Sequence, residues 1–153
     1  MPHDTSILVF NPRQAAVDYA LQFIGQPYRW GAYEGGGDDP ILGFDCSGFT
    51  GEILKSVGKM GLHERLNSRQ QHQRFIGSLT KEPLAGCLIF FSKVPGGEII
   101  HVEMCIDRFQ RIGSSGGDSS TDTIVEAAVQ NAFVKLRPIY SRPNIVGIVD
   151  PFK

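Results

Sequence analysis

Residues 44–49, with the sequence FDCSGF, mark the point where a glycine-rich segment meets an amphipathic helix. The segment before it, residues 25–45 (GQPYRWGAYEGGGDDPILGFD), has no regular pattern, and a loop of that length in a compact domain is usually functional. Apolar residues recur after it at helical spacing, at Phe49, Ile53, Leu54 and Val57. The pattern predicts a helix over residues 46–57 that begins at Cys46.

A thiol at a helix N-terminus faces unpaired backbone N–H groups and the positive end of the helix dipole. Both favour the thiolate, which is the nucleophilic form. Cys46 is therefore a candidate nucleophile, and the first-turn amides of Ser47 and Gly48 are candidates for holding an oxyanion. The alternative is that Cys46 is a small buried hydrophobic residue, as free cysteines often are.

The composition is that of an ordinary globular domain. The chain has 153 residues, 41% hydrophobic and 20% charged, with a formal net charge of −1. We expect one catalytic-sized domain over residues 1–153, and the near-neutral charge argues against nucleic acid as a partner. No stretch is apolar for long enough to predict a membrane span. The cysteines are three and widely spaced, which argues against a disulfide framework and a cysteine zinc site.

The rest of the chain predicts helices first and strands second. Helices are expected over residues 12–24, 46–57, 68–76 and 123–131, and strands over residues 87–91, 99–106, 108–112, 133–139 and 145–149. A tight turn near Asp107-Arg108 should pair the second and third strands, and residues 113–122 (GSSGGDSSTD) should form a second loop. This order predicts an α+β fold, with helices packed on one side of an antiparallel sheet.

A thiol nucleophile needs a base within hydrogen-bond reach, and histidine is the usual one. Three of the four histidines lie in the N-terminal tail or in polar stretches that should be exposed: His3, His63 and His72. His101 instead lies in a strand pattern, whose alternation places it on one face with Glu103 and Cys105. We expect this face where the sheet meets the Cys46 helix. The alternative is a solvated strand face.

Five short motifs follow one another along the chain: GQPYRWG (25–31), FDCSGF (44–49), LNSRQQ (66–71), GCLIFF (86–91) and HV (101–102). Between about residues 13 and 112 they resemble, in order and spacing, the motifs of the NlpC/P60 family, papain-like cysteine peptidases that act on bacterial cell-wall peptides. The resemblance implies a papain-like fold with Cys46 as nucleophile and His101 as base. Tyr28 would line the pocket and form a hydrogen bond near the reacting centre. The alternative for Tyr28 and Trp30 is aromatic packing beneath the loop, and we expect this for Trp30.

The same resemblance implies the chemistry. The chain would be a cysteine peptidase or amidase that hydrolyses peptide bonds in peptidoglycan stem peptides, with an oxyanion held at Ser47 and without a metal or organic cofactor. Two alternatives stay open. One is a peptidoglycan-binding or phage-tail structural domain that does not cut, and the other is a papain-like amidase or thioesterase with a substrate outside the wall.

The chain departs from the family pattern at three places. Cys87 stands where the family usually has aspartate, which implies a local change without loss of activity. Gly113 stands where the family has the third polar residue that orients the histidine, so the identity of that residue is left open. The candidates to replace it are a backbone carbonyl, a water or one of four side chains, those of Glu103, Ser114, Ser115 and Asp118. Insertions at residues 34–40 and 113–132 should flank the cleft, as flexible surface or as pocket walls.

Delivery to the wall is inferred from the N-terminus, MPHDTSILVFNPRQ, which does not resemble a secretory signal. We expect a protein made in the cytoplasm that acts at the cell wall through a phage particle or lysis. The SSGG insertion and the NAFVKLRPI segment resemble phage and prophage cell-wall peptidases, which implies phage tail proteins as partners.

Overall fold

The computed structural model describes residues 10–31 and 43–153, so the insertion at residues 34–40 and the tail with His3 lie outside the described residues. The helices of the described part are α1 (Pro12–Leu21), α2 (Cys46–Ser56), α3 (Ser68–Phe75) and α4 (Ile124–Gln130), with the 3₁₀ helices η1 (Ile76–Ser78) and η2 (Ile139–Ser141). Its strands are β1 (Leu79–Thr80), β2 (Leu88–Ser92), β3 (Ile99–Cys105), β4 (Gln110–Ser115), β5 (Phe133–Pro138) and β6 (Ile145–Val149).

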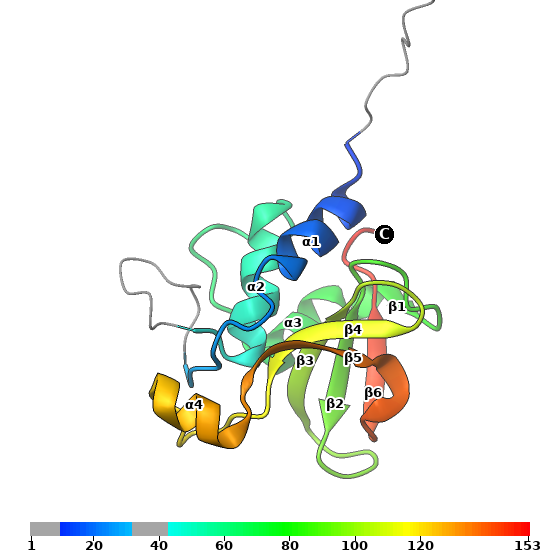
Figure 1. The fold of residues 1–153 in the computed structure, drawn as a ribbon. Coiled ribbons are helices and arrows are strands. Elements are labelled where there is room, and N and C mark those ends of the chain that lie inside the picture. Colours follow the sequence, from blue (N-terminus) through cyan, green and yellow to red (C-terminus); the bar gives the residue numbers. More distant parts are fainter. Residues whose placement is uncertain (1–9, 32–42) are drawn as a thin grey trace, which may run out of the picture.

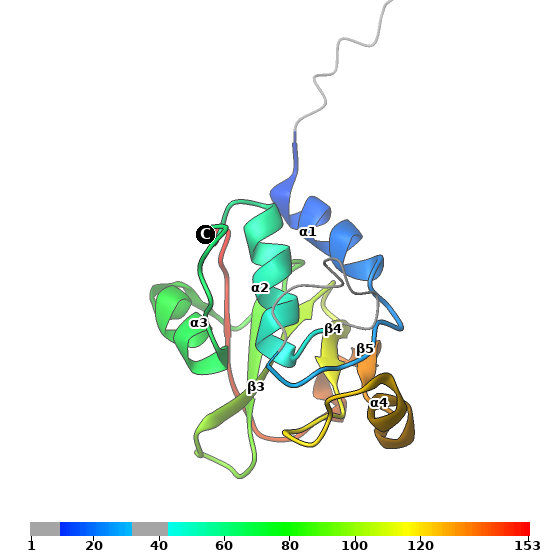
Figure 2. The same ribbon diagram turned by 90° about the vertical axis from the view of Figure 1, so that its left-hand side faces the viewer.

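The six strands form one sheet in the order β1-β6-β2-β3-β4-β5, and every pairing in it is antiparallel. Helices α1, α2 and α3 lie on one face of the sheet, whereas α4 lies apart from them beside β5 (Figures 1 and 2). The expected α+β architecture, with its helices on one side of an antiparallel sheet, is confirmed.

Helix α2 begins where the sequence predicts, because Asp45 caps it. The Asp45 carboxylate accepts a hydrogen bond from the Gly48 amide at 2.6 Å, which satisfies one of the N–H groups that a helix leaves unpaired at its start. The apolar side of the helix, including Phe49, Ile53 and Leu54, is fully buried. Burial of each such side chain contributes about 1.5–3 kcal/mol.

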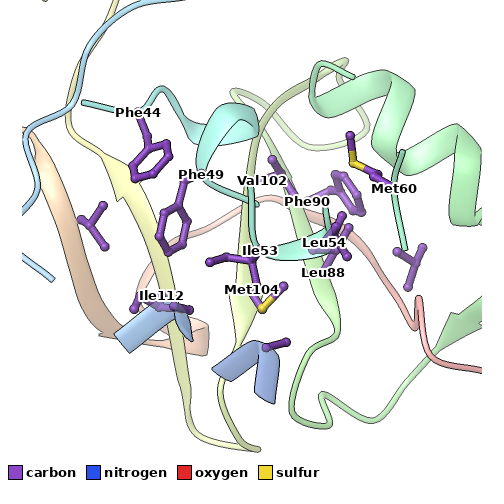
Figure 3. Packing of buried hydrophobic residues seen from close by; sticks show 14 of the residues in the cluster. Phe44, Phe49, Ile53, Leu54, Met60, Leu88, Phe90, Val102, Met104 and Ile112 are labelled. Atoms are coloured by element: carbon purple, nitrogen blue, oxygen red, sulfur yellow. The ribbon is translucent and has the colours of Figure 1, made fainter. Parts of the chain in front are cut away.

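The main core lies between this helix and the sheet. Figure 3 shows the apolar side chains of α2 against those of three strands: Leu88, Phe90, Val102, Met104 and Ile112. A smaller cluster contains the strand residues that alternate with these, together with Ile139 of η2: Cys87, Ile89, Phe91, Cys105, Ile148 and Ile139. The β2 and β3 strands are therefore apolar on both faces, apart from the polar side chains of Ser92, His101 and Glu103.

The largest differences from the expected elements are two boundaries and one missed strand. Helix α1 ends at Leu21 instead of residue 24, because the chain continues in turns with hydrogen bonds to carbonyls three residues back. Residues 113–115, expected in a loop, belong to β4, because they pair with β5. The two residues of β1 are too few to produce a visible alternation, and the sequence did not predict this strand.

Gln71 of α3 fixes the start of α2 from the side. Its fully buried amide donates to the carbonyl oxygens of Ser47, at 2.8 Å, and Leu66, at 3.0 Å. Its own oxygen accepts from the Thr50 hydroxyl at 2.7 Å. One side chain thus satisfies buried groups on two segments and holds the first turn of α2 in place.

We predict that Gln71→Ala lowers the free energy of unfolding by about 3 kcal/mol, because buried carbonyl groups lose their partners at roughly 1–3 kcal/mol each. Urea denaturation measures this change. The matched control is Gln73→Ala, which removes an exposed glutamine from the same helix and should change stability by less than about 0.5 kcal/mol. Equal effects of the two substitutions would contradict the assigned role.

Candidate active site

Cys46 and His101 come together where the N-terminus of α2 meets β3. The Cys46 thiol is half-buried and lies close enough to the His101 side chain to raise its pKa. His101 is buried, and its Nε2 lies 2.7 Å from Oε2 of Glu103. With Nε2 occupied, Nδ1 is the ring nitrogen left for the thiol. The structure thus brings the predicted nucleophile and the predicted base together at one cleft, with Glu103 bonded to the base.

Helix α2 packs on a different face of strand β3 from the one expected. We expected the His101 face of β3 to meet the Cys46 helix, but α2 packs on the opposite face, with Val102 and Met104. The thiol still reaches the imidazole because Cys46 is the first residue of α2 and because β3 pairs with β4 only at Met104 and Cys105. The end of β3 that carries His101 is therefore open to the helix start.

Glu103 occupies the position of the third residue of the site. Its Oε2 accepts hydrogen bonds from His101 and from Nη1 of Arg111, and all three side chains are buried. The β3–β4 register pairs Met104 with Ile112, so the next step of that register places Glu103 opposite Gly113. A Cβ added at Gly113 would lie 2.3 Å from Cγ of Glu103. The missing side chain at Gly113 is thus the space that Glu103 fills.

The other candidates for the third residue face elsewhere. The Ser114 hydroxyl donates to the Phe44 carbonyl at 2.6 Å, which ties β4 to the segment before Cys46. Asp118 is exposed and accepts from the amide and hydroxyl of Ser120. Ser115 lines the cleft and, among the described residues, makes no hydrogen bond with His101. Of the four side chains, Glu103 is the one that bonds to the imidazole.

The surroundings of the site shift the pKa of His101 and the pKa of Glu103. Burial opposes the imidazolium, but the hydrogen bonds to Cys46 and Glu103 outweigh it and raise the pKa of His101. Burial likewise opposes the Glu103 carboxylate, but the His101 and Arg111 cations outweigh it and lower the pKa of Glu103. The network therefore favours a protonated His101 beside an ionised Glu103.

The backbone amides that could hold an oxyanion differ from those expected. The Gly48 amide, expected to help hold an oxyanion, instead donates to the Asp45 cap. The amides of Cys46 and Ser47 are the first two of the helix and have no acceptor inside it. These two N–H groups are the ones placed to hold a negative oxygen beside the thiol.

Tyr28 and Trp30 flank the same cleft in different ways. Tyr28 is buried beside Gly117, where an added Cβ would lie 2.1 Å from the ring. Burial and the nearby charges of Cys46 and Asp45 raise the pKa of Tyr28, so its hydroxyl stays protonated as a hydrogen-bond donor. Trp30 was expected to pack beneath the loop, but it is 54% exposed and lines the cleft.

The cleft measures about 790 Å³, which is large enough for several residues of a peptide, and Cys46, His101 and Tyr28 all line it. Sequence reasoning missed two basic residues of its wall, Arg69 and Arg142. Arg69 lies in the LNSRQQ motif, whereas Arg142 is in a segment without a motif, so nothing in the sequence marked it. His72, expected to be exposed, is half-buried with its ring 5.0 Å from that of Phe90.

Across the described ranges, no three histidine, cysteine, aspartate or glutamate side chains are grouped to hold a metal ion. The helices in those ranges are also too short or too polar to cross a bilayer.

The fold and the site define the chain as papain-like: a cysteine at a helix N-terminus faces a histidine on an antiparallel sheet. The comparison with protein families is more specific. The NlpC/P60 family model matches residues 25–138, more than half of the chain, and the chain therefore belongs to the NlpC/P60 family.

Named relatives agree with this assignment. The bifunctional muramidase/DL-endopeptidase CwlT of Bacillus subtilis is 34% identical over 97 residues, which are 63% of this chain and 27% of that protein. The gamma-D-glutamyl-L-lysine dipeptidyl-peptidase of Bacillus cereus is 36% identical over 110 residues, which are 71% of this chain and 30% of that protein. The chain thus spans about a third or less of these two relatives.

The fold agrees as well. The crystal structure of an NlpC/P60 family protein from Bacillus cereus superposes with a TM-score of 0.69 at 24% sequence identity, over 92% of this chain and 40% of that one.

We predict that Glu103→Gln lowers the pKa of His101, because the neutral amide can still accept the Nε2 hydrogen bond but no longer stabilises the imidazolium. The alkaline limb of any His101-dependent activity should move to lower pH. NMR titration of the His101 ring measures the pKa without turnover. Glu98→Gln removes an exposed carboxylate close in sequence and should leave the titration unchanged. An unchanged or higher pKa in Glu103→Gln would refute the assignment.

We also predict that Gly113→Ala disturbs the site, because the new methyl group overlaps the Glu103 side chain and pushes it from His101. The His101 titration should move in the same direction as in Glu103→Gln. Gly77→Ala is the control, since a Cβ at Gly77 meets nothing within 4 Å. A normal titration in folded Gly113→Ala would show that Glu103 does not need the open space.

Proposed function

We propose that the chain is a cysteine peptidase that hydrolyses an amide bond in the stem peptides of bacterial peptidoglycan. The observation that carries the proposal is the placement of the Cys46 thiol and His101 on the wall of one cleft of peptide size, with the Glu103 carboxylate bonded to the imidazole. Cys46 acts as nucleophile, His101 as base and acid, and Glu103 as the group that orients His101.

The first half of the reaction forms an acyl-enzyme. His101 takes the proton of Cys46, and the thiolate attacks the carbonyl carbon of the scissile amide. The amides of Cys46 and Ser47 hold the negative oxygen of the tetrahedral intermediate. His101 then gives its proton to the leaving nitrogen, the carbon–nitrogen bond breaks, and an amine and a thioester of Cys46 remain.

The second half restores the enzyme. His101 takes a proton from water, the hydroxide attacks the thioester carbonyl, and the same amides hold the second oxyanion. Collapse of this intermediate releases a carboxylic acid and returns the proton to the Cys46 sulfur. Glu103 holds the imidazole in one orientation throughout, with its second cation, Arg111, keeping the carboxylate ionised.

The substrate class is supported by the relatives. Two of them are named as a DL-endopeptidase and a gamma-D-glutamyl-L-lysine dipeptidyl-peptidase, and the family match over residues 25–138 includes Cys46 and His101. For this chain we propose the same kind of substrate, a stem peptide with D-residues or γ-linkages. Delivery by a phage particle, with tail proteins as partners, stays a prediction of the sequence.

A domain that binds wall peptides without cutting them is disfavoured by one feature. The space at Gly113 and the Arg111 partner together keep a carboxylate on His101, an arrangement that serves proton transfer. Peptide binding alone does not require a buried, charged network behind the histidine. A papain-like amidase with a substrate outside the wall would use the same Cys46 and His101. The test below uses cell-wall substrates and therefore distinguishes the two activities.

We predict that Cys46→Ala and Cys46→Ser keep the fold and abolish release of peptide fragments from purified cell wall, because both remove the nucleophile. Mass spectrometry of fragments from defined muropeptides measures this and identifies the bond. Cys87→Ala, which removes a buried thiol of the other cluster, is the control and should still cut. Full activity in Cys46→Ala would overturn the mechanism.

A further inference from the structure

A second basic side chain lies close to the dyad. Arg142 follows η2, lines the same cleft as Cys46 and His101, and is half-buried. Its guanidinium carbon lies 5.1 Å from the centre of the Phe91 ring, and the Phe91 ring lies 5.9 Å from that of His101. The aromatic ring therefore supports the guanidinium at the edge of the reacting centre.

The charge of Arg142 is not matched by an ion pair with any residue in the described ranges. The carboxylate that acts on it, Glu103, is already bonded to His101 and Arg111. Burial lowers the pKa of Arg142, which reflects the cost of holding an uncompensated cation there. The cleft's other arginine differs, because Arg69 is 61% exposed and pairs with Glu98 at 3.3 Å.

Arg142 can be placed relative to the thiol. The charges that act on it are those of Glu103, Arg111 and Cys46, whereas Tyr28 interacts with Cys46, Asp45 and Asp118. Cys46 is the group common to both sets. Arg142 and Tyr28, which both line the cleft, are therefore both close enough to Cys46 to interact with its charge.

We propose that Arg142 binds a free carboxylate of the substrate, carried by the residue next to the scissile amide. This assignment rests on the proposed function and adds a specificity to it. An arginine fork is suited to a carboxylate because its two N–H groups bond both oxygens at once. Arg142 also lies beyond residues 25–138, so it is not part of the family match.

A γ-linked glutamyl residue supplies such a group. When the side-chain carboxyl forms the amide, the α-carboxylate stays free, a few bonds from the carbonyl that the thiolate attacks. One relative is named for a gamma-D-glutamyl bond. A substrate whose α-carboxyl has been converted to a carboxamide keeps the shape and loses the charge, which makes it the matched probe.

The test compares two synthetic peptides, L-Ala-γ-D-Glu-L-Lys-D-Ala and the same peptide with the glutamyl α-carboxylate replaced by a carboxamide. We expect kcat/KM of the native protein to be about 10- to 100-fold higher for the carboxylate, as one charge-assisted pair predicts. In Arg142→Ala this ratio should fall to about one, and Arg142→Lys should retain part of it. Arg108→Ala, which removes an exposed arginine in the β3–β4 turn, should keep the native ratio.

The outcomes separate this proposal from the proposed function. If the native protein cuts both peptides equally well, or if Arg142→Ala slows both by the same factor, Arg142 does not read the carboxylate and the peptidase assignment stands. If the native protein cuts neither peptide, calorimetry with Cys46→Ala decides. Tighter binding of the carboxylate peptide that Arg142→Ala abolishes supports the assignment, whereas equal or absent binding overturns it.

Discussion

The buried carboxylate of Glu103 is the constraint on which the site depends. An ionised carboxylate away from water is costly unless cations and hydrogen-bond donors surround it. Here His101 and Arg111 supply both, and Gly113 supplies the space. Loss of either cation would leave a buried charge uncompensated. The same carboxylate therefore fixes the orientation of the imidazole and the identity of its neighbours on β3 and β4.

The rest of the fold holds the nucleophile against this fixed imidazole. Gln71 anchors the first turn of α2 from one side, and the Ser114 hydroxyl anchors the preceding carbonyl of Phe44 from the other. Asp45 caps the same turn. Two of these bonds are buried and join segments far apart in sequence, and together the three hold the start of α2, with Cys46, beside the strand that carries His101. A base and a nucleophile that are held in position in this way transfer a proton efficiently.

The sequence predicted the helix at Cys46, the strand at His101 and the layer order, because these follow from apolar periodicity and a strong cap. It left the partner of His101 open because that depends on register. A two-residue turn at Asp107-Arg108 would place Glu103 opposite Ile112. The observed turn is one residue longer, with Asp107 accepting from the amides of Phe109 and Gln110. A one-residue change of register moves every side chain to the other face, and local sequence does not settle it.

A side chain on β3 can take the place of one on β4 for a geometric reason. Opposite residues on adjacent strands have Cβ atoms about 4.5–5.5 Å apart, so side chains from positions 103 and 113 can reach the same point beside His101. They cannot both occupy it, since a Cβ at Gly113 would overlap Glu103. A glycine at the third position therefore does not by itself mark a degenerate site. In this chain the residue two positions after the histidine is a glutamate that reaches the imidazole, with an arginine behind it.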